Sequence, residues 1–200
     1  KKAIAADGVG LRDDRHDLNR LSDLVMKWDG LRTSAPNSEA LKTVEQEIYA
    51  ELRRDVREAK AEVKQAQREV KQSTREVGAS HAEKARERLD RDGDRRALRD
   101  DKKDLRDDRR DRRDDVRDEK KAEELLAKKR ELASRLIDLQ KKIDAAGPRV
   151  DKLMREKQSD VLEEYLLISR EEVKLGLREI KEDKRELRED RRETREDRRK

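Results

Sequence analysis

The feature that most constrains the fold is a seven-residue repeat in which almost every residue is charged. Residues 98–118 read LRDDKKD, LRDDRRD and RRDDVRD, and related repeats occur at 11–17 and from 180 to the end of the chain. Most copies contain a single apolar residue, so a helix made of this repeat can bury only one narrow line of side chains. Because 54% of the chain is charged and 31% is hydrophobic, we expect thin layers of helices instead of a thick globular core.

The charges of the repeat are separated by sign around the helix. Counted from the leucine, and at about 100° per residue, positions two, five and six form a basic face, and positions three, four and seven form an acidic face opposite to it. Arg99 and Lys103, or Asp100 and Asp104, therefore bring like charges together, which disfavours an isolated helix. We expect the acidic face of one helix to lie against the basic face of another. The alternative is a simply solvated surface.

Elsewhere, apolar residues recur every three or four positions, which is typical of helices. Leu11 to Trp28 make one stripe, Leu41 to Val77 a second, and Leu125 to Ile143 the most strongly apolar one. The sequence therefore predicts an all-α fold in which long antiparallel helices form an elongated helical bundle or coiled coil. The predicted divisions are an N-terminal helix and loop (1–37), a second helix (38–77), a long helix that changes from charged to apolar (78–146) and a C-terminal helix (147–200), within one elongated helical domain.

Two helix ends have clear signals. Ser38 follows a loop at 33–37 and is a candidate N-cap for the second helix. Gly147-Pro148 should end the third helix, because glycine closes a helix and proline cannot continue one. If the chain folds back there, residue i of one arm lies near residue 295 − i of the other, because both arms rise equally per residue.

The end of the second helix is less clear. Gly78 followed by Ser80-His81-Ala82-Glu83, which has the pattern of a capping box, favours a break at 78–80. Asp92-Gly93-Asp94 indicates a second turn. An unbroken helix is the third alternative, since the heptad spacing continues through both places.

The sequence predicts neither an enzyme nor a cofactor site. His16 and His81 are far apart and lie in charged helical surroundings. No phosphate-binding glycine loop, nucleophile elbow or zinc-protease motif is present. Exposed carboxylates next to arginines have no reason to acquire the raised pKa that acid catalysis needs. We therefore expect no catalytic residue, no cofactor and no small-molecule substrate.

One acidic segment deserves comparison with a calcium loop. Asp90, Asp92, Asp94 and Asp101 have the spacing of the first, third, fifth and twelfth positions of an EF-hand. The sixth position of that loop needs glycine for a sharp turn, and here it is Arg95. These aspartates are the only metal-ligand candidates in the sequence, and an ordinary helix or turn fits them better.

Apolar residues cover a wider arc of the third and fourth helices than contact with one neighbour requires. We expect these side chains to contact further helices, a second subunit or another protein. The interface candidates are Leu125, Leu126, Leu136, Ile137, Tyr165, Leu166, Leu167 and Ile168. The function that fits best is a structural or scaffolding protein that self-associates through charge-complementary helix faces. The alternative is a chaperone-like or adaptor module that binds through this apolar patch.

Partners and location are constrained by charge and hydropathy. Nucleic acid is not the expected partner, because each basic face has an acidic face behind it and aromatic residues are only 2% of the chain. We expect a homo-oligomer or a complex with another helical protein. No apolar run approaches the roughly 18 residues of a membrane span. Ala3-Ile4-Ala5 has the small-x-small pattern of a signal-peptidase site, which favours export to the cell envelope or beyond.

The charge pattern makes a prediction about the isolated repeat. A peptide of residues 98–118 should be poorly helical in circular dichroism, because its like-charged i,i+4 pairs oppose the helix and few apolar contacts offset them. A peptide of similar length with alternating blocks of glutamate and lysine is the control. High helicity of the monomeric 98–118 peptide would instead support a free-standing single helix.

Overall fold

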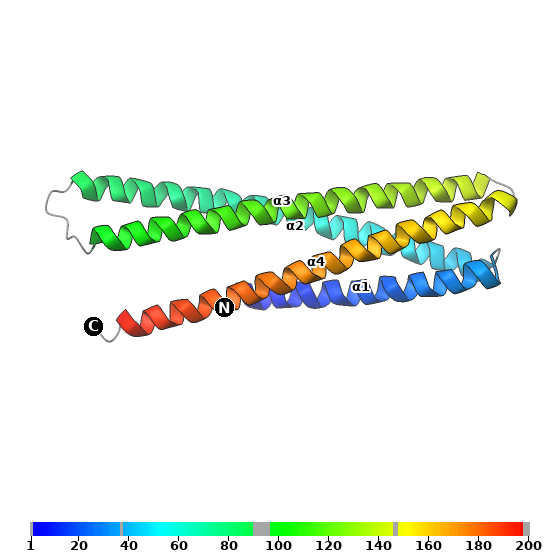
Figure 1. Ribbon diagram of the computed structural model, residues 1–200, viewed down its shortest axis with the longest axis horizontal. Coiled ribbons are helices and arrows are strands. Elements are labelled where there is room, and N and C mark those ends of the chain that lie inside the picture. The colour runs from blue at the N-terminus through cyan, green and yellow to red at the C-terminus, as the bar shows by residue number, and fades with distance from the viewer. Residues whose placement is uncertain (1, 37, 90–96, 146–147, 198–200) are drawn as a thin grey trace. The chain divides into compact units, whose positions relative to one another are not determined.

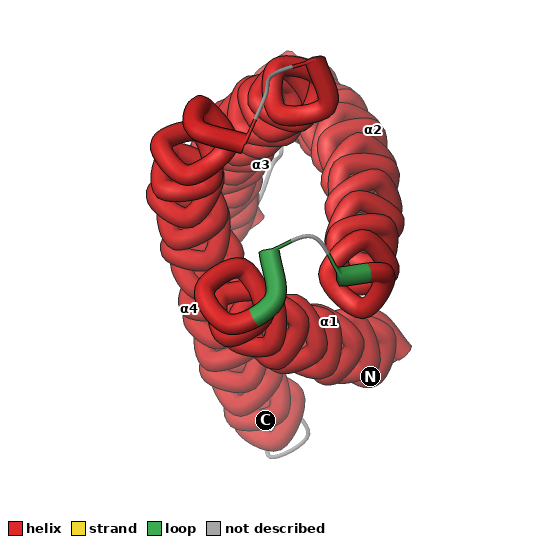
Figure 2. Tube along the Cα trace, turned by 90° about the vertical axis from the view of Figure 1, so that its right-hand side faces the viewer, coloured by secondary structure: helices red, strands yellow, loops and turns green. Residues whose placement is uncertain are grey.

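The computed structural model describes residues 2–36, 38–89, 97–145 and 148–197. These residues form four helices, which are α1 (Lys2–Ser34), α2 (Glu39–Leu89), α3 (Ala97–Ala145) and α4 (Pro148–Asp197). Apart from the short loop between α1 and α2, the described chain is helical, with no strand (Figures 1 and 2). The predicted all-α helical bundle is confirmed.

The chain divides into two compact units. Unit 1 contains Lys1–Asp55 and Lys128–Lys200, and unit 2 contains Val56–Ala127. Unit 1 therefore holds α1, the first part of α2, the last part of α3 and α4, whereas unit 2 holds the remaining parts of α2 and α3. That the two units make up one elongated domain stays a prediction.

The helices of unit 1 alternate in direction, as in an up-and-down four-helix bundle. Contacts between neighbouring helices show this alternation, because the residue number rises along one helix as it falls along the next. These contacts are Arg20–Glu51 and Trp28–Glu45 between α1 and α2, Asp55–Lys129 and Tyr49–Gln140 between α2 and α3, and Lys129–Glu172 and Gln140–Gln158 between α3 and α4.

Helices α1 and α4 lie side by side (Figure 1). Leu11 of α1 packs with Val173 and Ile180 of α4. Gly176 faces the same contact, and a Cβ at this position would lie 3.3 Å from Cδ1 of Leu11. The absence of a side chain at 176 therefore lets the two helices approach closely.

Most of the buried apolar side chains lie in unit 1, as the stripes from Leu11, Leu41 and Leu125 predict. The largest fully buried ones are Trp28, Leu41, Val44, Leu52, Leu132, Leu136 and Tyr165. Unit 2 has a thinner apolar seam, in which Ala59, Val63 and Leu126 form the core and Val56 and Ala122 pack against it. Because buried apolar area is the main favourable term in folding, unit 2 depends more than unit 1 on its polar contacts.

The start of α2 and that of α4 agree with the sequence signals. The backbone N–H of Leu41 donates to the side-chain oxygen of Ser38 over 3.1 Å, which is the predicted N-cap. Pro148 is the first residue of α4, where a missing N–H costs nothing. Gly147 lies outside the described residues. Helix α1 begins at Lys2, earlier than the apolar stripe from Leu11 indicated, because Ala3, Ala5 and Ala6 favour a helix.

The favoured break at 78–80 is wrong. Helix α2 continues through Gly78 to Leu89. The Ser80 hydroxyl, expected to cap a new helix, instead donates to the Asp108 carboxylate of α3. A glycine inside a helix costs only about 1 kcal/mol relative to alanine, which such contacts with a neighbouring helix can offset. The alternative turn at Asp92–Asp94 lies outside the described residues.

The side-chain contacts between α3 and α4 are offset from the predicted pairing by about one helical turn. Nη1 of Arg135 lies 3.3 Å from Oε2 of Glu164, whereas the 295 − i rule pairs Arg135 with Asp160. The reason is the direction of the side chains, which lean toward the N-terminus of their own helix. In antiparallel arms, a long side chain of α3 therefore leans away from the turn and meets one from α4 that leans toward it.

This register can be tested by crosslinking, because the chain has no native cysteine. Cysteines at Arg135 and Glu164 should be joined by a short bifunctional thiol reagent, since these exposed side chains already meet. The matched control places cysteines at Arg135 and Asp160, which should react more slowly because one helical turn, about 5.4 Å, separates 160 from 164. Faster crosslinking of the control pair would instead support the pairing of residue i with residue 295 − i.

Candidate functional site

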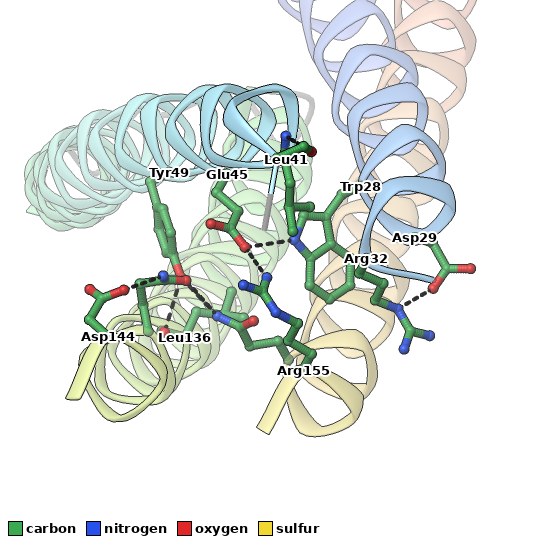
Figure 3. A network of polar contacts seen from close by, with 12 residues as sticks. Trp28, Asp29, Arg32, Leu41, Glu45, Tyr49, Leu136, Asp144 and Arg155 are labelled. Carbon is green, nitrogen blue, oxygen red and sulfur yellow. Dashed lines mark hydrogen bonds and ion pairs between the residues drawn. The ribbon is translucent and has the colours of Figure 1, made fainter. Parts of the chain in front are cut away.

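The most buried polar groups of unit 1 lie between helices, at three levels of the bundle. At the first level, Oε1 of Glu45 on α2 accepts hydrogen bonds from Trp28 Nε1 on α1 over 3.2 Å and from Arg155 Nη1 on α4 over 2.5 Å (Figure 3). Glu45 and Arg155 are both buried. The guanidinium of Arg32 lies over the Trp28 ring, 5.4 Å from its centre. Glu45 therefore joins three helices.

The second level centres on Tyr49 of α2 (Figure 3). Its hydroxyl donates to the backbone carbonyl of Leu136 over 3.1 Å and accepts from Nε2 of Gln158 over 3.3 Å. Gln158 also donates to Gln140 over 2.9 Å. Burial and the nearby Glu45 carboxylate raise the pKa of the Tyr49 hydroxyl above its ordinary value, because both disfavour a phenolate.

The third level contains a buried lysine. Lys129 of α3 is 1% exposed. Its Nζ lies 2.7 Å from Oδ1 of Asp55 and is bonded to Glu172 of α4. Oδ2 of Asp55 also accepts from the Tyr165 hydroxyl over 2.7 Å. Burial lowers the pKa of the Lys129 ammonium, but the carboxylates of Glu172 and Asp55 raise it by more, so the pKa is raised and the cation is kept.

These levels hold the helices in one alignment. A buried ion pair adds little net stability over apolar packing, but loss of one partner leaves a buried charge and typically costs about 3–5 kcal/mol. Because α2 and α4 contribute to all three levels, a slip of either helix along its neighbours would break pairs at every level. The arrangement therefore explains how helices with few apolar residues keep a defined register.

These buried polar groups were not predicted from the sequence, although it contains a signal for two of them. Glu45 lies on the apolar stripe between Leu41 and Ile48, and Lys129 lies on the stripe between Leu125 and Leu132. In a chain this rich in charge, a charged residue on an apolar stripe is easily taken for part of the surface. A spacing of three or four positions from buried apolar residues distinguishes such a charged residue from one on the surface.

Unit 1 contains a small cavity and a larger surface groove. A cavity of about 10 Å³ among Trp28, Tyr49 and Leu136 is at the lower limit for one water molecule. A surface groove of about 500 Å³ runs between α3 and α4. In its lining, Arg135 is paired with Glu164, and Asp138 with Lys141. Neither space identifies a ligand site.

The predicted interface residues do not form one exposed patch. Leu136, Tyr165, Leu166 and Ile168 are buried within unit 1, and Leu126 is buried in the seam of unit 2. Leu125 is half-buried. Ile137 and Leu167 are exposed, at 42% and 57%. A role of these residues in binding a partner stays a prediction.

The exposed surface of unit 2 is dominated by charges that are separated by sign on α3. Partial desolvation and the like charges of four nearby aspartates raise the pKa of the Asp111 carboxyl. These neighbours are Asp107, Asp108, Asp115 and Asp114. Asp107 and Asp111 are exposed. The other side of α3 carries the exposed arginines Arg106, Arg109, Arg110, Arg113 and Arg117. The two faces predicted for the repeat are therefore present on this helix.

The described residues give no support to the candidate metal site. Within this part of the chain, no group of three or more histidine, aspartate or glutamate side chains is arranged to hold a metal ion. Asp90, Asp92 and Asp94, and the side chain of Asp101, lie outside it. His16 of α1 is exposed beside Asp17, and His81 of α2 is exposed beside Arg109. The two histidines lie in different units, His16 in unit 1 and His81 in unit 2.

Comparison with protein-family models, with curated proteins and with solved structures finds no match to this chain. In the described ranges, no helix has a stretch that is long and apolar enough to cross a bilayer. The physical arrangement of the charges is thus the basis for inferring a function.

The buried tyrosines predict the response of unit 1 to alkaline pH. Tyr49 and Tyr165 are the two tyrosines of the chain, and burial, with a neighbouring carboxylate, raises the pKa of both. The hydroxyl of an unfolded tyrosine loses its proton at about pH 10. Above that pH the unfolded state binds fewer protons than the folded one, so stability should fall by up to about 1.4 kcal/mol per pH unit for each tyrosine until the folded pKa is reached.

The measurement is the ultraviolet absorbance of tyrosinate, followed from about pH 9 to 12 with and without urea. Native protein should show little tyrosinate at about pH 10.5, whereas protein in urea should show most of it. In Tyr165→Phe the remaining signal comes from Tyr49 alone, and the alkaline loss of stability should be smaller. Equal titration of native and unfolded protein would contradict the burial of these hydroxyls.

Proposed function

We propose that this chain is a structural or scaffolding protein, without catalytic activity, that self-associates through charge-complementary helix faces. The observation that carries the proposal is the separation of charge on α3 of unit 2, where the acidic face around Asp111 and the arginine face from Arg106 to Arg117 lie on opposite sides of one helix. Such a helix surface is complementary to another copy of itself.

The packing of unit 1 supports this proposal, because its helices already associate in this way. Arg20 of α1 pairs with Glu51 of α2 over 2.9 Å, and Arg54 of α2 pairs with Asp17 of α1. Side chains of opposite charge thus meet along the boundary between two helices of the same chain. The faces of unit 2 carry the same kinds of residue and are exposed.

The alternative, a chaperone-like or adaptor module, has less support. Its proposed binding patch includes Leu136, Tyr165 and Leu166, which are buried in unit 1. Presenting these side chains to a client would require the bundle to open and would expose apolar area that stabilises it. Ile137 and Leu167 are exposed but are single apolar side chains on different helices, which soluble proteins commonly have.

Self-association by charge should depend strongly on salt. In about 20 mM NaCl, sedimentation velocity should show species heavier than the 23.6 kDa chain, and in about 0.5 M NaCl the mass should fall toward that of one chain. Circular dichroism at both salt concentrations is the control that the helices are retained. A single chain mass at all salt and protein concentrations would refute self-association. Assembly that strengthens with salt would indicate an apolar interface and favour the adaptor alternative.

A further inference from the structure

The two helices of unit 2 carry the same charge pattern relative to their shared seam. Let heptad position a be that of Val56, Val63 and Val70 on α2 and of Leu105 on α3, whose numbers differ by multiples of seven. Position g, on one side of the seam, is then acidic in both helices, and positions b and e, on the other side, are mainly basic. The g residues are Glu62, Glu69 and Glu76 on α2 and Asp111 and Asp118 on α3.

Because the two helices run antiparallel, equivalent positions meet on the same side of the hairpin. In such a pair, position e of one helix lies beside position e of the other, and g beside g. The contacts agree with this geometry. Gln67 donates to Glu123 over 3.3 Å and Arg109 donates to His81 over 2.8 Å, and all four residues are at position e.

The hairpin therefore has one acidic side and one basic side. The acidic side contains the exposed residues Glu69, Glu76, Asp107 and Asp111. The basic side contains the exposed residues Lys60, Lys64, Lys71, Arg106, Arg109 and Arg113. Glu69 and Glu76 are bonded within α2 to the neutral side chains of Gln65 and Gln72, whereas Asp118 on α3 pairs with Lys121. The bonds of Glu69 and Glu76 to glutamines therefore leave the negative charge of these two residues in place.

We propose that the occupant of each side is unit 2 of another copy of this chain, with the acidic side of one copy against the basic side of the next, so that assembly does not stop at a dimer. This inference rests on the proposed function and specifies its geometry. Two acidic sides repel one another, as do two basic sides, so the contact joins unlike surfaces. A pair of copies joined in this way still has one free acidic side and one free basic side.

A contact between unlike surfaces is heterologous, and it propagates unless a ring closes. A symmetric dimer would instead need one surface that complements itself. The same geometry explains why like charges are kept together along each side of the hairpin. Their repulsion weakens the isolated hairpin, and an incoming surface of opposite charge relieves it. Assembly is consequently stabilised at low salt, where screening is weakest.

The test uses full-length chains with one side reversed in charge. The acidic-side variant carries Glu69→Lys, Glu76→Lys and Asp111→Lys, and the basic-side variant carries Lys64→Glu, Lys71→Glu and Arg113→Glu. A control matched to the acidic-side variant, Glu131→Lys with Glu156→Lys and Glu171→Lys, makes the same change in net charge as that variant at exposed positions of unit 1. Circular dichroism checks that each variant keeps its helices.

At low salt, the unmodified chain should show an average mass that rises with concentration beyond that of a dimer in light scattering. Each one-sided variant alone should lose association by about tenfold or more, because its two sides now carry the same sign. An equimolar mixture of the two variants should regain assembly, since one supplies basic sides and the other acidic sides. The control should associate like the unmodified chain.

The outcomes separate this inference from the proposed function. A discrete dimer that is unaffected by concentration would overturn the propagating contact and leave charge-driven self-association standing. Loss of assembly in the control as well would place the contact outside unit 2 and overturn the inference alone. A single chain mass under all conditions would overturn both. Failure of the mixed variants to assemble, although the unmodified chain does, would exclude pairing of the two sides.

Discussion

The structure depends on pairing charge across helix boundaries, because the chain has few apolar residues with which to join helices. Burying an unpaired charge costs far more than one apolar contact returns, so each charge that is buried between helices needs a partner of opposite sign. In unit 1 this need is met within the chain. Glu45 bonds to Trp28 and Arg155, and Lys129 bonds to Asp55 and Glu172, each linking three helices.

The two units arrange their charged and apolar residues in different ways. Unit 1 surrounds its ion pairs with leucine, isoleucine and aromatic side chains, which exclude water and strengthen the pairs. Unit 2 has a seam of alanine, valine and single leucines, and its charges are sorted by sign on its surface. The difference follows from the number of apolar residues per heptad. With several apolar residues per heptad, charge can be buried in pairs, whereas with one, the charged side chains stay at the surface.

Some local features could be predicted because they depend on neighbouring residues only. Ser38 caps α2 as its position before an apolar stripe indicates, and Pro148 begins α4. Gly78 shows the limit of such signals. A glycine and a capping-box pattern indicate a helix end only if nothing favours continuation, and here Ser80 contacts Asp108 on a helix distant in sequence. The register of α3 and α4 required the lean of long side chains, which a count of residues per turn leaves out.

The sequence by itself determined the helical class, the stripes that become the core of unit 1, and the two charged faces of the repeat, since these follow from helical periodicity alone. Only the tertiary structure decided that Lys129 and Glu45 are buried, because a charged residue on an apolar stripe is buried only where partners from other helices reach it. Tertiary structure also decided that like charges share one side of the hairpin. That arrangement requires the antiparallel direction and the register of α2 and α3, which depend on contacts such as Gln67 with Glu123, far apart in the sequence.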